Sequence, residues 1–324
     1  MDALLPWQRA QWNQLIHSKA VGRLPHALLC SGSAGLGKAQ FAECAAQALL
    51  CYTPAPDGMP CYHCRSCRLF LAGSHPDYSR VSPSATGKTI TIEQVRELHT
   101  FLQHTSQFGG AKIALLAPAE RLTLNAANSL LKMLEEPPLG SVLLLVTAMP
   151  FQLPATVRSR CQRLVFQVPA PTLARDWLTG RVEKTAPPEL LLQLSDGAPL
   201  LAKRYSQNGA LAHRATLLAA FQDVIKGTAD PVQTAALWLQ ADIAENFRWL
   251  ISWHRDMIRL KMMENPPWLS NPDFRVVLQQ LADKWPAALL FQRLDSAIQL
   301  RALCATQVNL QLMVEAFLGD CASG

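Results

Sequence analysis

Residues 32–38 have the glycine and lysine spacing of a loop that binds nucleotide phosphates. Gly32 and Gly37 are five positions apart, and Lys38 follows directly. In such loops the glycines let backbone amides wrap the phosphates, and the lysine neutralises their charge. A short apolar run precedes the loop and a helical pattern follows it, which is the context this motif requires. The sequence therefore predicts a phosphate loop built from Gly32, Gly35, Gly37 and Lys38.

The groups that would hold Mg²⁺ beside this loop are missing. The residue after the lysine normally supplies a Ser or Thr hydroxyl to the metal, and here it is Ala39. A working ATPase also needs an acidic pair at the end of a neighbouring strand, where residues 117–120 read Ala-Pro-Ala-Glu. Because both defects affect the same metal and water chemistry, we expect no ATP hydrolysis at this site. Binding of ATP or ADP without turnover stays open.

Four of the nine cysteines fall within seventeen residues, at positions 51, 61, 64 and 67. Four thiolates are the number that a closed tetrahedral zinc site uses. Reduced structural thiols and an iron–sulfur cluster are the alternatives, and His63 is a competing ligand. No nearby Glu or His is well placed as a general base, so a catalytic metal is not expected. The sequence predicts a structural zinc bound by Cys51, Cys61, Cys64 and Cys67.

Three arginines lie around a short helical turn that leads into an apolar run: Arg158, Arg160 and Arg163. They are typical of a solvated surface. They also fit an arginine finger, whose guanidinium stabilises charge on the γ-phosphate of a site on another subunit. Composition does not choose between these two interpretations.

The first 165 residues alternate apolar runs with helical patterns. Continuous apolar runs bounded by turn residues are typical of buried parallel strands, and we expect strands at 26–30, 77–81, 112–117, 141–148 and 163–168. Helical patterns cover 39–51, 92–105 and 122–136, the last stopped by two prolines. This alternation predicts a doubly wound α/β domain with a parallel sheet.

From about residue 170 the strand pattern disappears, and leucine, alanine and tryptophan recur at helical spacing. We expect an α/β domain over 1–168 with the zinc module at 51–67, a small helical lid domain over 169–207, and a helical collar domain over 208–324. The fold class is α/β plus all-α. The tryptophans of the last domain fit either a buried core or a subunit interface.

Composition sets broad limits on the function. The chain has 324 residues, 49% hydrophobic and 17% charged, with a formal net charge of +6. This charge permits a nucleic-acid or phosphate-bearing partner without requiring one. No apolar run approaches the roughly 20 residues of a membrane span, and the N-terminus has no signal-peptide pattern. We expect a cytoplasmic protein with no membrane partner.

Several motifs together resemble the bacterial clamp-loader subunits of the AAA+ family. They are "LLKMLEEPP" (130–138), "SRC" (159–161), the CxxCxxC insertion, "GSHPDY" (73–78) and "ITIEQVREL" (90–98). The match covers the first 165 residues well and weakens afterwards. The degenerate metal-binding positions make the chain similar to the stationary subunit of the loader, which belongs to the DNA polymerase III holoenzyme. The motor subunits keep both sets of groups.

The resemblance implies a role by assembly. A helical collar would join this chain to the delta subunit and to three gamma/tau motor subunits, and the complex would load the sliding clamp onto primed DNA. In this family the arginine of the SRC motif completes the ATP site of the adjacent motor. Carried over, that residue is Arg160, with Ser159 and Cys161 positioning its turn. The sensor position of the lid domain falls on Leu200, which lacks the usual arginine.

Two other functions are compatible with parts of the sequence. A self-sufficient AAA+ ATPase with an unconventional Mg²⁺ shell would hydrolyse ATP alone and lose activity in Lys38→Ala. A zinc-containing DNA-binding module would bind DNA tightly by itself, in a salt-sensitive way. The modest charge and the lack of a basic stripe with interleaved aromatic residues disfavour the second of these.

Overall fold

The computed structural model describes residues 4–85, 87–183, 186–207, 209–240, 242–304 and 308–323. The chain divides into two compact units, Met1–Leu173 and Ala174–Gly324. Within the described ranges, no helix is both long and apolar enough to cross a membrane.

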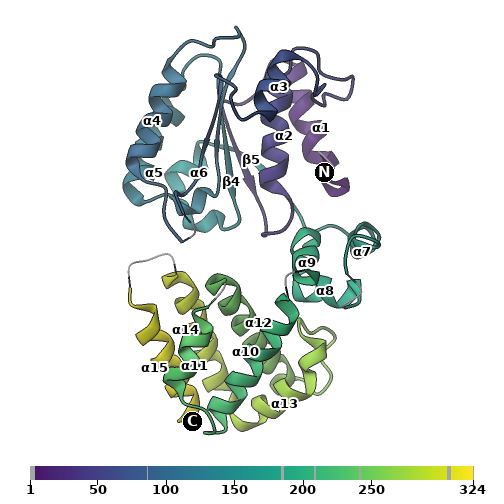
Figure 1. Ribbon diagram of the computed structural model, residues 1–324, viewed down its shortest axis with the longest axis vertical. Coiled ribbons are helices and arrows are strands. Elements are labelled where there is room, and N and C mark those ends of the chain that lie inside the picture. Colours follow the sequence, from purple (N-terminus) through teal and green to yellow (C-terminus); the bar gives the residue numbers. More distant parts are fainter. Residues whose placement is uncertain are drawn as a thin grey trace. The chain divides into compact units, whose positions relative to one another are not determined.

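A five-stranded sheet forms the centre of the first unit (Figure 1). Its strands are β1 (Ala27–Ser31), β2 (Tyr78–Val81), β3 (Lys112–Leu116), β4 (Ser141–Thr147) and β5 (Gln162–Val165). Their order in the sheet is β2-β3-β4-β1-β5, and every pairing is parallel. All residues of β1, β3 and β4 are buried, as continuous apolar runs predict. The expected parallel sheet is confirmed, with each strand within two residues of its predicted start.

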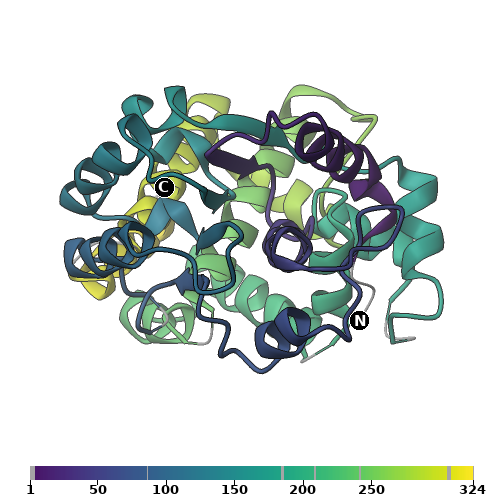
Figure 2. The ribbon, with the colours of Figure 1, turned by 90° about the horizontal axis from the view of Figure 1, so that it is seen from above.

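Helices cover both faces of this sheet, which confirms the doubly wound arrangement (Figure 1, and from above in Figure 2). One side carries α1 (Arg9–Ala20), α2 (Lys38–Leu50) and α3 (Arg65–Leu71). The other carries α4 (Ile92–Gln103), α5 (Leu124–Glu135) and α6 (Ala155–Ser159). Helices α1 and α3 were not expected from the sequence. Short 3₁₀ turns are η1 (Pro6–Gln8), η2 (Ala119–Arg121), η3 (Pro150–Gln152) and η4 (Pro272–Phe274).

The α4–α6 side holds one continuous apolar core. Leu116 and Leu145 of the sheet pack with Leu98 of α4, Leu130 of α5 and Val157 of α6, all at most 1% exposed. The hydroxyl of Thr91 caps α4 by accepting from the Gln94 amide, and that of Thr123 caps α5 by accepting from the Ala126 amide. These caps and apolar stripes fix α4 and α5 against the sheet.

The second unit is helical throughout its described part. It contains most of α7 (Pro171–Leu178), followed by α8 (Pro188–Leu194), α9 (Pro199–Ser206), α10 (Ala210–Ile225), α11 (Pro231–Trp238), α12 (Ile243–Met262), α13 (Arg275–Lys284), α14 (Ala287–Leu303) and α15 (Leu310–Ala322). Trp238, Trp253 and Trp285 are buried, so they belong to the core. The division into a lid at 169–207 and a collar at 208–324 stays a prediction.

Candidate functional site

The predicted sites lie at opposite edges of the sheet. In a parallel sheet all strands end on one side, called here the carboxyl edge, and begin on the opposite side, called the amino edge. The loop at 32–38 follows β1, and residues 117–120 follow β3, so both lie at the carboxyl edge. Arg160 and Asp77 come directly before β5 and β2, so they lie at the amino edge. The structure therefore separates the phosphate loop from the arginine of the SRC motif.

The loop at 32–38 has the backbone that a phosphate loop needs. Gly35 and Gly37 have φ angles of 79° and 78°, in the left-handed region that favours glycine, and Gly37 is the N-cap of α2. Gly32 is required for a different reason. A Cβ at this position would lie 2.2 Å from the carbonyl oxygen of Phe166, beyond the end of β5. At least one of the predicted glycines is therefore explained without a phosphate, by this close approach and by its φ of 149°.

Lys38 is folded back onto its own loop. Its Nζ donates a 2.6 Å hydrogen bond to the carbonyl of Ser33, and its side chain is buried. Burial lowers the pKa of Lys38 to about 8, and the negative charge of Glu120 opposes this shift. From the other side, the Gln8 side-chain amide donates to the carbonyls of Leu36 and Gly37, at 2.9 and 3.0 Å. The loop is thus held by hydrogen bonds from Gln8, and its lysine is bonded to the loop itself.

The carboxyl edge offers little to a metal ion. Ala117 and Pro118 follow β3, where a working ATPase of this type carries its acidic pair. Ala39, in place of the usual Ser or Thr, lies in the first turn of α2. Sequence reasoning overlooked Glu120 as a neighbour of Lys38. Its Oε1 accepts a 3.0 Å hydrogen bond from the amide of Ala148, which fixes the carboxylate beside the loop. One fixed carboxylate remains where an ATPase uses a hydroxyl and an acidic pair.

Arg160 follows the last residue of α6, with its guanidinium on the surface. One terminal nitrogen donates to the carbonyl of Thr156 at 3.1 Å, and the other lies 2.7 Å from Oε1 of Glu135. The Arg160 and Glu135 side chains are 38% and 50% exposed, so this ion pair contributes little stability and is easily exchanged for another anion. Ser159 donates to the Thr156 carbonyl at 3.1 Å, and Cys161 is buried.

The other two arginines of this segment have different environments. Arg158 lies against the ring of Phe151, with its guanidinium carbon 5.3 Å from the ring centre. Arg163 is exposed on β5, which is the outermost strand on its side of the sheet. Of the three, Arg160 combines surface exposure with an acidic partner and a helix end that orients it.

The four predicted cysteines come together. Their sulfur atoms all lie within 4.8 Å of one another, and those of Cys61 and Cys67 are 4.0 Å apart. In a tetrahedral zinc site with Zn–S bonds near 2.3 Å, sulfur atoms are about 3.8 Å apart. Backbone amides donate to three of the sulfurs: Cys61 to Cys51, Cys64 to Cys61, and Cys67 to Cys64. The donor set and its spacing fit zinc.

The pKa values of the four thiols shift in different directions, and burial raises those of Cys51 and Cys67. A hydrogen bond with the Thr53 side chain lowers the pKa of Cys61 to about 5, which favours the thiolate that binds metals. His63 instead bonds the carbonyl of Cys61 through Nδ1, at 2.6 Å. Among the described residues, the set of close metal-binding side chains contains the four cysteines and not His63.

A buried polar bracket, not predicted from the sequence, links the cysteine module to the sheet. Ser66 donates to the Leu50 carbonyl at 2.7 Å, and its hydroxyl lies 2.9 Å from Nε2 of His75. Nδ1 of His75 accepts from the Asp77 amide at 3.0 Å, so Nε2 carries the proton in the neutral ring. Burial lowers the pKa of His75, which keeps the ring neutral. The motif "GSHPDY" therefore has a structural role.

Asp77 extends this bracket to the loop before β3. Its carboxylate accepts from the Ser106 hydroxyl at 2.8 Å and from the amides of Gln107 and Phe108 at 2.9 and 3.1 Å. The ring of Phe108 contacts those of Tyr52 and His75, at centre distances of 5.9 and 5.3 Å. The cysteine module and the amino edge of the sheet are thus one connected structure.

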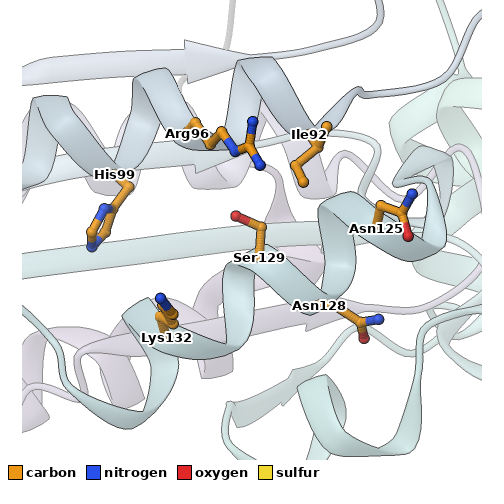
Figure 3. A pocket seen from close by; sticks show the side chains of 7 residues that line it. All are labelled: Ile92, Arg96, His99, Asn125, Asn128, Ser129 and Lys132. Atoms are coloured by element: carbon orange, nitrogen blue, oxygen red, sulfur yellow. The ribbon is translucent and has the colours of Figure 1, made fainter.

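A surface pocket of about 430 Å³ lies between α4 and α5 (Figure 3). Its lining residues are mostly cationic or hydrogen-bonding: Ile92, Arg96 and His99 from α4, and Asn125, Asn128, Ser129 and Lys132 from α5. Within the described ranges, neither Arg96 nor Lys132 has a carboxylate within ion-pair distance. The pocket depends on contact between two helices, which the sequence pattern does not reveal.

Two protein-family models match the chain. The model described as "DNA polymerase III, delta subunit" matches residues 7–170, and "DNA polymerase III, delta subunit, C terminal" matches residues 208–322. The DNA polymerase III subunit delta' of Pseudomonas aeruginosa is 36% identical, covering 100% of this chain and 98% of that protein. Subunit delta' of Escherichia coli K12 is 31% identical, covering 95% of this chain and 92% of that protein. A solved DNA polymerase III gamma subunit-related protein from Thermotoga maritima is 17% identical, covers 96% of this chain and 99% of that one, and has a TM-score of 0.43.

Proposed function

This chain belongs to the family of DNA polymerase III delta' subunits, and we propose that it is the stationary, non-hydrolysing subunit of a clamp loader. In this role it helps to load the sliding clamp onto primed DNA. The observation that carries the proposal is the contrast between the two edges of the sheet. The carboxyl edge has lost its metal ligands, whereas the amino edge presents an oriented, exposed Arg160.

The phosphate loop does not hydrolyse ATP in this proposal. Hydrolysis needs Mg²⁺ to neutralise the charge that develops on the phosphates, and an acidic residue to orient the attacking water. Ala39 and Ala117 remove the two direct routes to the metal, and Glu120 is committed to the Ala148 amide through one oxygen. Lys38 keeps a positive charge below a pH of about 8, so retention of phosphate without turnover remains compatible with the loop.

Arg160 acts on a neighbouring motor subunit instead. A guanidinium supplied in trans stabilises charge on the transferring γ-phosphate and contributes a factor of about 10³–10⁵ to turnover in other phosphate-transfer proteins. The exposed pair with Glu135 holds the side chain in place before assembly, and a γ-phosphate would replace that carboxylate. Ser159 and Cys161 fix the turn from both sides.

The proposed partners follow from family membership. They are the delta subunit and the gamma/tau motor subunits, joined through the helical C-terminal region. Apolar side chains that are exposed on α14 and α15 support a subunit interface there: Phe291, Ile298, Leu312 and Met313. The four cysteines would hold a structural zinc that stabilises the module after α2, with no step of catalysis assigned to it.

The pocket between α4 and α5 is our candidate contact with DNA. Arg96 and Lys132 would pair with backbone phosphates, and the amides of Asn125 and Asn128 would donate hydrogen bonds. Such contacts position the duplex without reading its sequence, as a loader that acts at any primed site requires. Lys132→Ala in the assembled loader should weaken DNA binding and lower the slope of log affinity against log salt by about 1. Lys88→Ala, at an exposed loop lysine, is the matched control and should change neither.

The proposed function is tested by steady-state ATP turnover of the reconstituted loader with clamp and primed DNA. Arg160→Ala should lower turnover, whereas Arg163→Ala, at an exposed arginine three residues away, should not. Lys38→Ala should leave turnover unchanged. Each variant is first shown to assemble. Turnover by the isolated chain that is lost in Lys38→Ala would establish a self-sufficient ATPase, and tight DNA binding by the isolated chain would favour a DNA-binding module.

A further inference from the structure

Phe151 is the most exposed Phe, Tyr or Trp side chain in the part of the chain that the structure describes. It is 84% exposed and lies in η3, between the end of β4 and the start of α6. At this exposure the ring adds almost nothing to the core of the chain. Single exposed apolar side chains are common on protein surfaces, but aromatic side chains are enriched at the buried centres of protein interfaces.

The segment that carries Phe151 is held rigidly. The amide of Met149 donates to the hydroxyl of Thr147 at 3.0 Å, and the amide of Leu153 donates to the carbonyl of Pro150 at 3.2 Å. The side chains of Leu153 and Val157 are 2% and 0% exposed, so both anchor the segment in the core. A backbone that is already ordered loses little conformational entropy when a partner covers the side chain it carries.

The surroundings of Phe151 are basic. Arg158 lies over its ring at 5.3 Å, and Arg160 follows two residues later. No Asp or Glu occurs between Glu136 and Asp176 in the sequence, and Glu135, just before this stretch, is paired with Arg160. A partner that fits this surface therefore combines an apolar pocket for the ring with acidic groups around it.

We propose that Phe151 inserts into an apolar pocket rimmed by carboxylates on the motor subunit whose ATP site receives Arg160. This inference rests on the proposed function, because it names a second contact with the same partner. Phe151 follows β4 at the carboxyl edge of the sheet, Arg160 precedes β5 at the amino edge, and the short helix α6 joins the two positions. A subunit that engages Arg160 at the end of α6 is therefore well placed to cover the surface that leads to it. Phe151 acts as an anchor that sets the position of the finger, without touching the reacting phosphate.

Hydroxyl-radical footprinting of the full chain tests the contact directly. Oxidation of Phe151 should fall at least about five-fold when the chain assembles with the motor subunits and a non-hydrolysable ATP analogue, because a hot-spot ring is fully covered. Primed DNA alone should leave it unchanged. Leu71, exposed on α3 at the other face of the sheet, controls for radical dose. Unchanged oxidation in the assembly would overturn the inference, and protection by DNA alone would assign Phe151 to nucleic acid instead.

Binding measurements provide a second, independent readout. Phe151→Ala should weaken the affinity of the chain for the motor subunits about ten-fold or more in the presence of the ATP analogue, as truncation of a hot-spot aromatic residue does. Phe151→Leu should recover part of this loss, and Leu71→Ala should cause none. Because the Phe151 ring is exposed, these variants are expected to fold normally.

The two proposals fail in distinguishable ways. If Arg160→Ala lowers turnover while Phe151 stays reactive in the assembly, the proposed role of Arg160 is supported and that of Phe151 is refuted. If Phe151 becomes protected while Arg160→Ala has no effect on turnover, the contact through Phe151 is supported and the proposed role of Arg160 is refuted. If the chain does not associate with the motor subunits, both are refuted.

Discussion

Replacement of Asp77 by alanine should destabilise the first unit by about 3 kcal/mol. The carboxylate is fully buried and accepts from the Ser106 hydroxyl and from the amides of Gln107 and Phe108. Each donor left without a partner costs about 1–3 kcal/mol when it stays buried. Gln107 is exposed and can bond to water, so the total falls well below the sum of three such penalties.

The pH dependence of this effect has a definite sign. Burial alone would raise the pKa of Asp77, but the hydrogen bonds from Gln107, Ser106 and Phe108 outweigh it, and the net pKa is lowered. A carboxyl group with a lowered folded-state pKa contributes stability above its unfolded pKa of about 3.9, and loses it as the pH falls through the folded value. The difference between wild type and Asp77→Ala should therefore be constant near neutrality and shrink in acid.

Urea denaturation measures the change, and hydrogen exchange of peptides from 78–116 assigns it to the first unit. The matched control is Asp57→Ala, since Asp57 is an exposed carboxylate of the cysteine module that accepts from the amide of Met59. This control should cost less than about 1 kcal/mol. A loss below about 1 kcal/mol for Asp77→Ala, or an equal loss for both variants, would refute the view that this bracket ties the module to the sheet.

Three further predictions concern the metal site and the phosphate loop. Elemental analysis of the purified chain should find one zinc per molecule. Cys61→Ser should abolish zinc binding, whereas Cys304→Ser, outside the cluster, should not. Equal zinc binding by both variants would exclude the site. Gly32→Ala should cost about 3 kcal/mol in urea denaturation, because its Cβ would meet the Phe166 carbonyl and its φ of 149° is one that L residues rarely adopt. Gly73→Ala, at φ 69° but in open space, should cost about 1 kcal/mol, and equal costs would contradict the close approach to Phe166. The stability of wild type relative to Lys38→Met should rise between about pH 8 and pH 10, because in this range the unfolded chain holds a proton on Lys38 that the folded chain has released. A stability difference that does not change with pH would show that Lys38 is not buried as described.

The strands were predictable because they coincide with short apolar runs. Strands β1, β3 and β4 are buried along their whole length, whereas β2 and β5, the first and last strands in the order of the sheet, are partly exposed. Helix α1 was not predictable, since Trp12 and Leu15 are its only buried residues and most of its other residues are polar. Trp12 fixes this helix through distant contacts, with its indole nitrogen donating to the carbonyl of Asp57 and its ring against Phe41. Helix α3 begins between Cys64 and Cys67. The spacing of these cysteines was interpreted as metal-ligand spacing, so the helical pattern was not recognised.

The same distinction separates the predicted from the unpredicted site residues. The phosphate loop and the four cysteines are local motifs whose spacing carries their geometry, and the structure brings the cysteines together. The bracket from Ser66 through His75 to Asp77 and the loop before β3 joins segments up to about thirty residues apart. The approach of Glu120 to Lys38 likewise depends on the order of strands in the sheet. Such contacts follow from the fold, which must be known first.

The central claim is that this chain acts on a neighbour's ATP through Arg160, and one measurement tests it most directly. It is the amplitude of the pre-steady-state burst of ADP from the assembled loader, which counts active sites. With three motor subunits and one finger from this chain, Arg160→Ala should lower the amplitude by about one third, because a missing finger slows its site about 10³-fold or more. Arg163→Ala should leave the full burst. An undiminished burst in Arg160→Ala, with assembly intact, would contradict the account.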